Sequence, residues 1–122
     1  MTLQVLPQTF TVCQIADVSA VDFSREFVFF TKSDEERSLV CESAFAPANT
    51  IAREDGWRAF RASGVLEFSL VGILAKLSGL LAQEGISIFA VSTFNTDYIL
   101  VKEASFPSAL AALAGAGYAI LE

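Results

Sequence analysis

The chain has 122 residues, of which 53% are hydrophobic and 18% are charged, and its formal net charge is −6. A chain of this size and apolar content can bury a core and fold as an ordered globular protein. Its acidity argues against nucleic acid and anionic membranes as partners, because phosphate recognition depends on clusters of Lys and Arg, and the 8 present here are dispersed.

The sequence does not predict a membrane protein. The most apolar run, Leu70 to Ala82, is shorter than the roughly 20 residues that span a bilayer, and it contains Lys76. The first ten residues, MTLQVLPQTF, lack the cationic start and the long apolar stretch of a signal peptide. We therefore expect a cytoplasmic protein.

Seven segments are rich in β-branched and aromatic residues and are bounded by turn residues, which predicts strands. In chain order they are Thr9–Ala16, Phe27–Lys32, Leu39–Glu42, Trp57–Ser63, Ile86–Phe94, Tyr98–Glu103 and Tyr118–Leu121. Helical spacing of apolar residues is clear twice, at Leu70, Leu74, Leu77 and Leu81 and at Phe106, Leu110, Leu113 and Ala114. Glycine often ends a helix, so we expect the first to end at Gly85 and the second at Gly115 or Gly117.

The residue types present favour no catalytic or metal site. The chain has no histidine, which removes the commonest general base and the commonest zinc ligand. Its two cysteines, Cys13 and Cys41, lie in apolar segments without CxxC spacing, and we expect buried thiols, with a disulfide or a reactive thiol as the alternative. The acidic run at residues 34–36 is interpreted as a solvated turn. We therefore expect no enzyme activity, no cofactor and no metal.

An internal repeat relates two parts of the chain. The segment FVFFTKSDEERSLVCE, from Phe27, aligns with IFAVSTFNTDYILVKE, from Ile88, at an offset of 61 residues. Strand, polar turn and strand coincide in this alignment. Only the second segment is preceded by enough chain for a full helix. We therefore predict two related halves, a degenerate one at residues 1–56 and a complete one at residues 57–122.

The second half has the predicted order β-α-β-β-α-β. Right-handed crossovers then place both helices on one face of a four-stranded antiparallel sheet, an α+β, ferredoxin-like fold. The strand at Trp57 could close the sheet of the first half or open that of the second, and the sequence leaves both possibilities open.

The stretch EFSLVGILAKLSGLLAQEGISIFAVSTFNTDYILVKE, from Glu67 to Glu103, closely resembles tandem ACT-domain proteins of bacteria, which are related to the ACT domains of aspartokinase and of the CASTOR arginine sensors. In the first half, TVCQIA, EFVFFTKSDEERSLVCE and GWRAFRASG are also similar to this family. The resemblance implies an ACT domain in tandem with a degenerate ACT-like half. It also implies a regulatory, non-catalytic protein that binds an amino acid or another small metabolite at a domain or subunit interface.

The resemblance further implies that a ligand lies between the loop before the first helix and the strand that faces it. The corresponding residues are Ser69, Leu70, Val71, Gly72 and Ile73 on one side and Thr93, Phe94, Asn95, Thr96 and Asp97 on the other. Two of them depart from the family pattern, in which Thr is usual at the position of Val71 and Asp at that of Asn95. The first turn of a helix offers unpaired N–H groups to a carboxylate, and Asp97 could face an ammonium or guanidinium group.

A structural explanation of the same residues stays open. Gly72 could serve only the packing of the helix on its sheet, and residues 95–97 could form an ordinary hairpin turn.

The sequence therefore leaves three hypotheses for the function. The first is an amino-acid sensor that acts through self-association or through a partner enzyme, and a homodimer is expected because apolar content is high and edge strands are exposed. The second is a structural or protein-interaction module that binds no ligand. The third, an enzyme using Glu67 and Asp97, is disfavoured by the absence of histidine.

Overall fold

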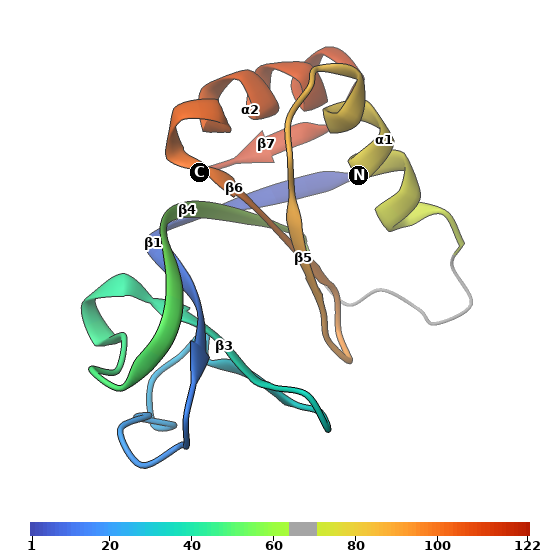
Figure 1. Ribbon diagram of the computed structural model, residues 1–122. Coiled ribbons are helices and arrows are strands. Elements are labelled where there is room, and N and C mark those ends of the chain that lie inside the picture. Colours follow the sequence, from blue (N-terminus) through green and yellow to red (C-terminus); the bar gives the residue numbers. More distant parts are fainter. Residues whose placement is uncertain (64–70) are drawn as a thin grey trace. The chain divides into compact units, whose positions relative to one another are not determined.

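The structure is a computed structural model that describes residues 1–63 and 71–122. Figure 1 shows its elements in chain order. They are β1 (Thr2–Ile15), β2 (Phe29–Lys32), β3 (Arg37–Glu42), η1 (Ser43–Phe45), β4 (Thr50–Ala62), α1 (Ile73–Gln83), β5 (Phe89–Ser92), β6 (Asp97–Lys102), η2 (Glu103–Ser105), α2 (Phe106–Gly115) and β7 (Ala119–Leu121). All seven predicted strands and both predicted helices are confirmed, with shifted boundaries.

The chain forms two compact units. The larger unit consists of residues 1–7 and 58–122, and the smaller unit consists of residues 8–57. The expected boundary between residues 56 and 57 therefore differs from the structure at the N-terminus, because the first seven residues lie with the second half. Strands β1 and β4 run through both units, so the strand at Trp57 closes one sheet region and opens the other.

The larger unit has the predicted order β4-α1-β5-β6-α2-β7, but its sheet is not the expected four-stranded antiparallel one. The strand order of the whole sheet is β2-β3-β1-β4-β6-β5, with β7 paired to β1. The start of β1 thus lies between β4 and β7, and its pairing with β7 is parallel, with Leu3 opposite Ile120. The extra strand is held because Leu3 and Val5 are buried in the core of this unit.

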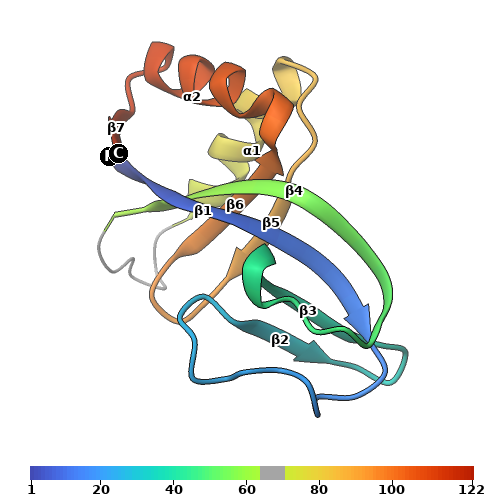
Figure 2. The same cartoon turned by 90° about the vertical axis from the view of Figure 1, so that its left-hand side faces the viewer.

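Both helices of the larger unit pack on one face of its sheet, as Figure 2 shows. Leu77 and Leu81 of α1 and Ala109 and Leu113 of α2 are buried in the same cluster as Phe60 of β4. Burying this apolar surface supplies most of the driving force for the arrangement.

Two residues after the end of each helix lies a glycine with a positive φ, which L side chains rarely adopt. At Gly85, φ is 71°, and the amide of Ile86 donates to the carbonyl of Leu81. At Gly117, φ is 100°, and the amide of Tyr118 donates to the carbonyl of Leu113. Gly115 is thus the last residue of α2, and Gly117 is the glycine that takes the left-handed conformation after it.

The smaller unit contains no helix besides the 3-10 turn η1, and all its residues are described. Its core cluster consists of Cys13, Ile15, Leu39 and Cys41. Turns and bends occupy most of the segment between β1 and β2, and Val21 and Val28 of this segment pack against the cluster. The expectation that a full helix fits only in the second half is confirmed.

The β2–β3 and β5–β6 hairpins correspond at an offset of 60 residues, one residue fewer than the predicted alignment. The two hairpins start at Phe29 and Phe89, and their second strands start at Arg37 and Asp97. A shift of one residue moves every side chain to the other face of a sheet. The structural equivalent of Leu39 is therefore Ile99, and both residues belong to core clusters. The identical residues of the alignment at offset 61, such as Leu39 and Leu100, therefore lie on opposite faces of their strands.

In the part of the chain that the structure describes, neither helix is long and apolar enough to cross a membrane.

Candidate functional site

The first predicted segment lies at the start of α1. Gly72 is the residue before the helix, with φ of 78° and ψ of 3°, and its carbonyl accepts the first helical hydrogen bond from the amide of Lys76 at 2.9 Å. A Cβ added at Gly72 would meet no described atom within 4 Å. Close packing of the helix on its sheet therefore does not explain this glycine, and its left-handed backbone does. The next amides, of Ile73 and its two successors, have no acceptor within the helix and point out of its first turn.

The second predicted segment is the turn between β5 and β6, and it is closed by its own hydrogen bonds. The amide of Thr93 donates to the carbonyl of Thr96 at 2.9 Å, and the Thr93 hydroxyl donates to the same carbonyl at 3.0 Å. The Thr96 side chain is 5% exposed, and its hydroxyl donates to the carbonyl of Ala62 on β4 at 3.1 Å. Both threonines therefore build the turn and attach it to the sheet.

The remaining turn residues are more open to solvent. Asn95 is exposed, and Phe94 is 76% exposed. Asp97 is half-buried at the start of β6, and one of its carboxylate oxygens accepts a hydrogen bond from the Ser92 hydroxyl at 2.7 Å. The second oxygen and the Asn95 amide are the groups of this turn that remain most suitable for a ligand.

The predicted site residues at the start of α1 differ in their exposure to solvent. Ser69 and Leu70 lie outside the described residues. Val71 is 89% exposed, whereas Ile73 is half-buried and packs against the core. The α1 start and the β5–β6 turn thus differ in character, the first offering backbone amides and the second offering Asn95 and Asp97.

A pocket that the sequence analysis missed lies beside the α1 start. It has a volume of about 190 Å³ and is lined by Met1, Ile73, Lys76, Ala116, Gly117 and Tyr118. The Lys76 ammonium lies 5.7 Å from the centroid of the Tyr118 ring. The sequence signal that could have identified this pocket is Lys76, which interrupts the apolar run of the helix.

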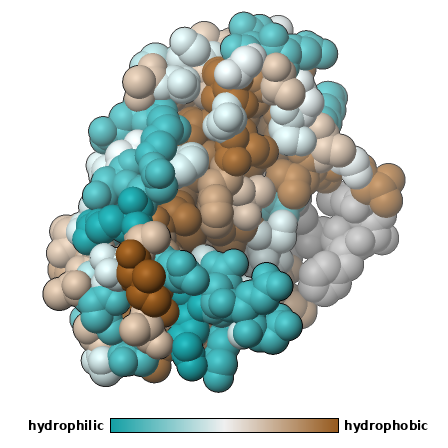
Figure 3. All heavy atoms as spheres, viewed as in Figure 1, coloured by the Kyte–Doolittle hydropathy of each residue, from teal (hydrophilic) through white to brown (hydrophobic). Residues whose placement is uncertain are grey.

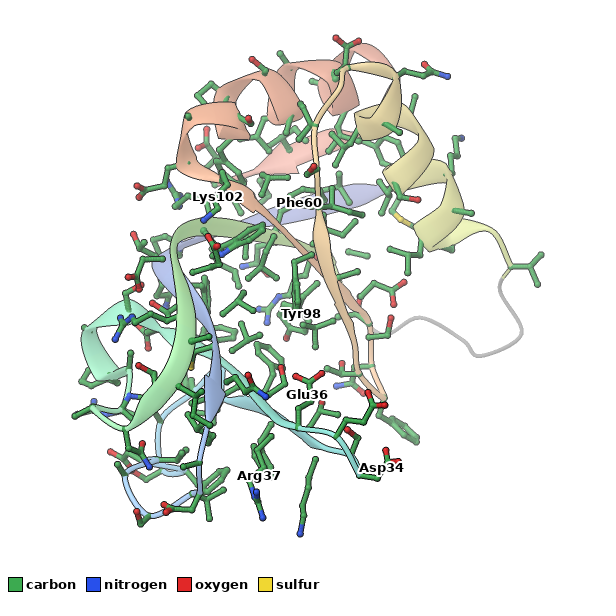
Figure 4. The ribbon with its side chains drawn as sticks, viewed as in Figure 1. Asp34, Glu36, Arg37, Phe60, Tyr98 and Lys102 are labelled. Carbon is green, nitrogen blue, oxygen red and sulfur yellow. The ribbon has the colours of Figure 1, made fainter. Side chains whose placement is uncertain are left out.

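A half-buried polar network on the sheet face opposite the helices was not predicted from the sequence. Arg61 of β4 donates to Gln4 of β1 at 3.1 and 3.2 Å and to the Tyr98 hydroxyl of β6 at 3.0 Å. Figure 4 shows Tyr98 and Lys102 near the two ends of β6. The network joins three adjacent strands, and we assign it a structural role because its donors and acceptors satisfy one another.

The two thiols of the smaller unit are buried and free. Burial raises the pKa of the Cys41 thiol to about 11, and the neighbouring Cys13 contributes to that rise. Burial also raises the pKa of Cys13, against an opposing effect of the Arg53 guanidinium. A thiol that stays protonated is a poor nucleophile and a poor metal ligand. No group of His, Cys, Asp and Glu among the described residues could hold a metal ion.

The ACT domain family model matches residues 52–115, which include α1, the β5–β6 hairpin and α2. The chain belongs to the ACT domain family. No curated protein sequence matches it.

Solved structures agree with the family. The chain is similar to protein Atu0741 from Agobacterium tumefaciens, with 30% identity, a TM-score of 0.86, and coverage of 98% of this chain and 91% of that one. It is also similar to VC0802 from Vibrio cholerae, described as a possible transport protein, with 21% identity, a TM-score of 0.72, and coverage of 93% and 88%.

The regulatory subunit of aspartate kinase from Thermus thermophilus shares the fold, with 12% identity, a TM-score of 0.66, and coverage of 96% and 97%. The predicted ACT domain is confirmed by the family model, and the aspartate kinase subunit adds a similarity of structure at 12% identity. At this level of identity, the similarity concerns the fold alone.

Proposed function

We propose that this ACT-domain protein is a non-catalytic regulator that binds an amino acid. In this proposal, the ligand carboxylate binds the amides of the first turn of α1, and its cationic group faces Asp97 and Asn95. The response passes to a second copy of the chain or to a partner enzyme. The observation that carries the proposal is that both ligand-binding segments implied by the ACT resemblance lie within residues 52–115, which match the family.

The chemistry of the two segments supports the proposal. The α1 start offers amides that have no acceptor within the helix, at the positive end of the helix dipole, and Gly72 brings no side chain to them. Asp97 retains one carboxylate oxygen beyond its bond to Ser92. Charge-assisted hydrogen bonds contribute about 1.5 to 3 kcal/mol each, so two or three are enough for the roughly 4 to 8 kcal/mol of a millimolar to micromolar ligand.

One observation favours the second candidate, a module that binds partners and no ligand. Thr93 and Thr96 use their polar groups on each other and on Ala62, and Val71 and Phe94 are largely exposed. A turn that satisfies itself and presents an aromatic side chain also suits a protein contact.

We also propose that the smaller unit is a degenerate ACT-like half that lost its helices. Its β2–β3 hairpin repeats the β5–β6 hairpin in register, in the turn hydrogen bond from Ser33 to Glu36, and in the 3-10 turn that follows. The strands β3 and β6 have the same pattern of buried and exposed residues. Without a helix, this half offers no first-turn amides, so we place the ligand in the larger unit only.

A thermal-shift screen against the twenty amino acids and common nucleotides tests the proposal. A ligand that binds the native state stabilises it by RT ln(1 + [L]/Kd), which is about 2.7 kcal/mol at a hundredfold excess over Kd. We expect one amino acid or a related group to raise the melting temperature in proportion to the logarithm of its concentration. A screen in which no amino acid shifts the transition would favour the module without a ligand.

A further inference from the structure

The pocket between the start of α1 and the end of α2 combines the Lys76 ammonium with apolar side chains. Lys76 projects from the first turn of α1, and Tyr118 lies three residues after the end of α2. Ile73, Ala116 and Met1 supply apolar atoms around them. All six lining residues belong to the larger unit, so the pocket is a feature of that unit alone.

The side chains that line this pocket carry a positive charge, whereas the whole protein is acidic. The chain carries a net charge of −6, yet none of the six residues that line the pocket is a carboxylate. Lys76 lies over the face of the Tyr118 ring, at 5.7 Å from its centroid. The first turn of α1 adds the positive end of its dipole beside Ile73. An anion is therefore the charged group that this place favours.

The pocket offers little to an ammonium group. The carbonyls of Ala112, Leu113 and Ala114 at the end of α2 already accept hydrogen bonds from the amides that follow the helix. A free amino acid would have to leave its ammonium group without an acidic partner among the lining residues. The chemistry thus selects a carboxylate whose remaining part is apolar.

The size of the pocket fits such a molecule. A cavity of about 150 Å³ accommodates benzene, and this pocket has a volume of about 190 Å³. We propose that the pocket at Lys76 and Tyr118 binds a small monocarboxylate with an apolar body, the carboxylate on the Lys76 ammonium and the body against the Tyr118 ring. The pocket shares Ile73 and the first turn of α1 with the proposed amino-acid site, but it uses Lys76 and Tyr118 in place of Asp97 and Asn95.

The test is an NMR titration of the 15N-labelled protein with benzoate, and with benzamide as the uncharged molecule of the same shape. We expect benzoate at about 1 to 10 mM, the range of a ligand held by roughly 3 to 4 kcal/mol, to shift the amides of Ile73, Lys76, Ala116, Gly117 and Tyr118 saturably. Benzamide should shift them much less, because it cannot pair with the Lys76 ammonium.

Two variants and a control complete the experiment. Lys76→Gln should weaken benzoate binding by about three- to tenfold, the range for one exposed ion pair with hydrogen-bonding geometry. Tyr118→Leu should weaken benzoate and benzamide together, because it removes the ring that both use. Lys32→Gln, which makes the same charge change on β2 outside the pocket, should leave binding unchanged.

Several results would overturn the inference. They are non-saturable shifts, equal shifts with benzamide, or equal weakening by Lys32→Gln and Lys76→Gln, which would indicate a general charge effect. The backbone spectrum of each variant shows whether it is folded, so loss of binding and loss of structure are separated. Benzoate has no ammonium group to pair with Asp97, so a thermal-shift screen in which no amino acid binds would not by itself overturn this inference.

Discussion

At the residue scale, Gly72 carries two roles that substitution experiments must separate. Its φ of 78° is a backbone requirement that exists without any ligand. Its missing side chain leaves the first-turn amides of α1 accessible. A bulky residue at this position would both strain the backbone and block a ligand, so loss of binding in such a variant would not identify the cause.

A measurement of unfolding stability tests the backbone requirement at Gly72. We expect Gly72→Ala to destabilise the protein by about 1 kcal/mol, since a left-handed conformation costs an L residue about 1 to 2 kcal/mol. Gly79→Ala is the matched change inside α1, where a new Cβ meets no described atom within 4 Å. It should stabilise the protein by about 0.5 to 1 kcal/mol, because alanine favours a helix interior over glycine. Equal effects of both variants on the urea midpoint would contradict the role assigned to Gly72.

The buried thiols predict a loss of stability at high pH. Cys41 has a folded pKa of about 11 and an ordinary value of 9.0, so the unfolded chain releases the proton first as pH rises. The stabilisation is therefore complete below pH 9 and is lost progressively up to about pH 11. Cys41→Val should flatten the fall of the urea midpoint across this window while it leaves the midpoint at pH 7 nearly unchanged. Identical pH profiles for the two proteins would show that the thiol does not titrate as assigned.

At the element scale, a buried hydroxyl attaches the turn between β5 and β6 to the neighbouring strand β4. The Thr96 hydroxyl donates to Ala62 on β4, and its side chain is almost fully buried. The equivalent residue of the β2–β3 hairpin, Glu36, is exposed. Figure 4 labels Glu36 at the end of that hairpin, beside Asp34 and Arg37. The two hairpins thus differ at this turn position: the Thr96 hydroxyl bonds the neighbouring strand, whereas Glu36 is exposed to solvent.

This difference gives a matched pair of variants. We expect Thr96→Ala to cost about 1 to 3 kcal/mol, since it leaves the buried Ala62 carbonyl without its partner. Glu36→Ala should change stability by less than about 0.5 kcal/mol, the usual range for exposed positions. Chemical unfolding measures both, and a neutral Thr96→Ala would indicate that the turn is held by other contacts.

Much of the fold could be predicted from local sequence, and the failures have physical causes. The helices and hairpins follow from periodicity and turn residues that lie close together in the chain. The length of β4 could not be predicted in this way. Its residues 53–56, Arg-Glu-Asp-Gly, have the composition of a turn, yet they continue the strand, with Gly56 at φ of 81°. The first residues of β1 were missed because their parallel partner, β7, lies at the other end of the sequence.

The candidate site was predicted less completely than the fold. Sequence reasoning named Thr93 and Thr96 as ligand residues, but their hydrogen bonds are made within the turn and to β4. Hydrogen bonds of this kind depend on a tertiary neighbour, Ala62, that periodicity does not reveal. The pocket at Lys76 and Tyr118 also depends on the packing of α1 beside the end of α2, which no local pattern encodes.

At the scale of the whole molecule, the sheet formed by the described residues ends in two edge strands. Strands β2 and β5 are the ends of the strand order, and Figure 3 shows apolar surface over β5. Unpaired strand edges invite pairing with another chain. We therefore expect a homodimer, and light scattering should give twice the chain mass of 13.1 kDa at micromolar concentrations. A mass of one chain, with and without amino acids, would contradict this expectation.

The most direct test of the proposed function is calorimetric titration with the amino acid that gives the largest thermal shift. We expect Asp97→Ala and Asn95→Ala each to weaken binding by about tenfold to a hundredfold, the loss of one charge-assisted or polar contact at about 1.4 kcal/mol per factor of ten. Glu35→Ala, in the equivalent turn of the smaller unit, should bind like the unchanged protein. If Glu35→Ala were impaired while Asp97→Ala and Asn95→Ala bound normally, the amino-acid site would not lie at the β5–β6 turn, and the proposed function of this segment would be wrong.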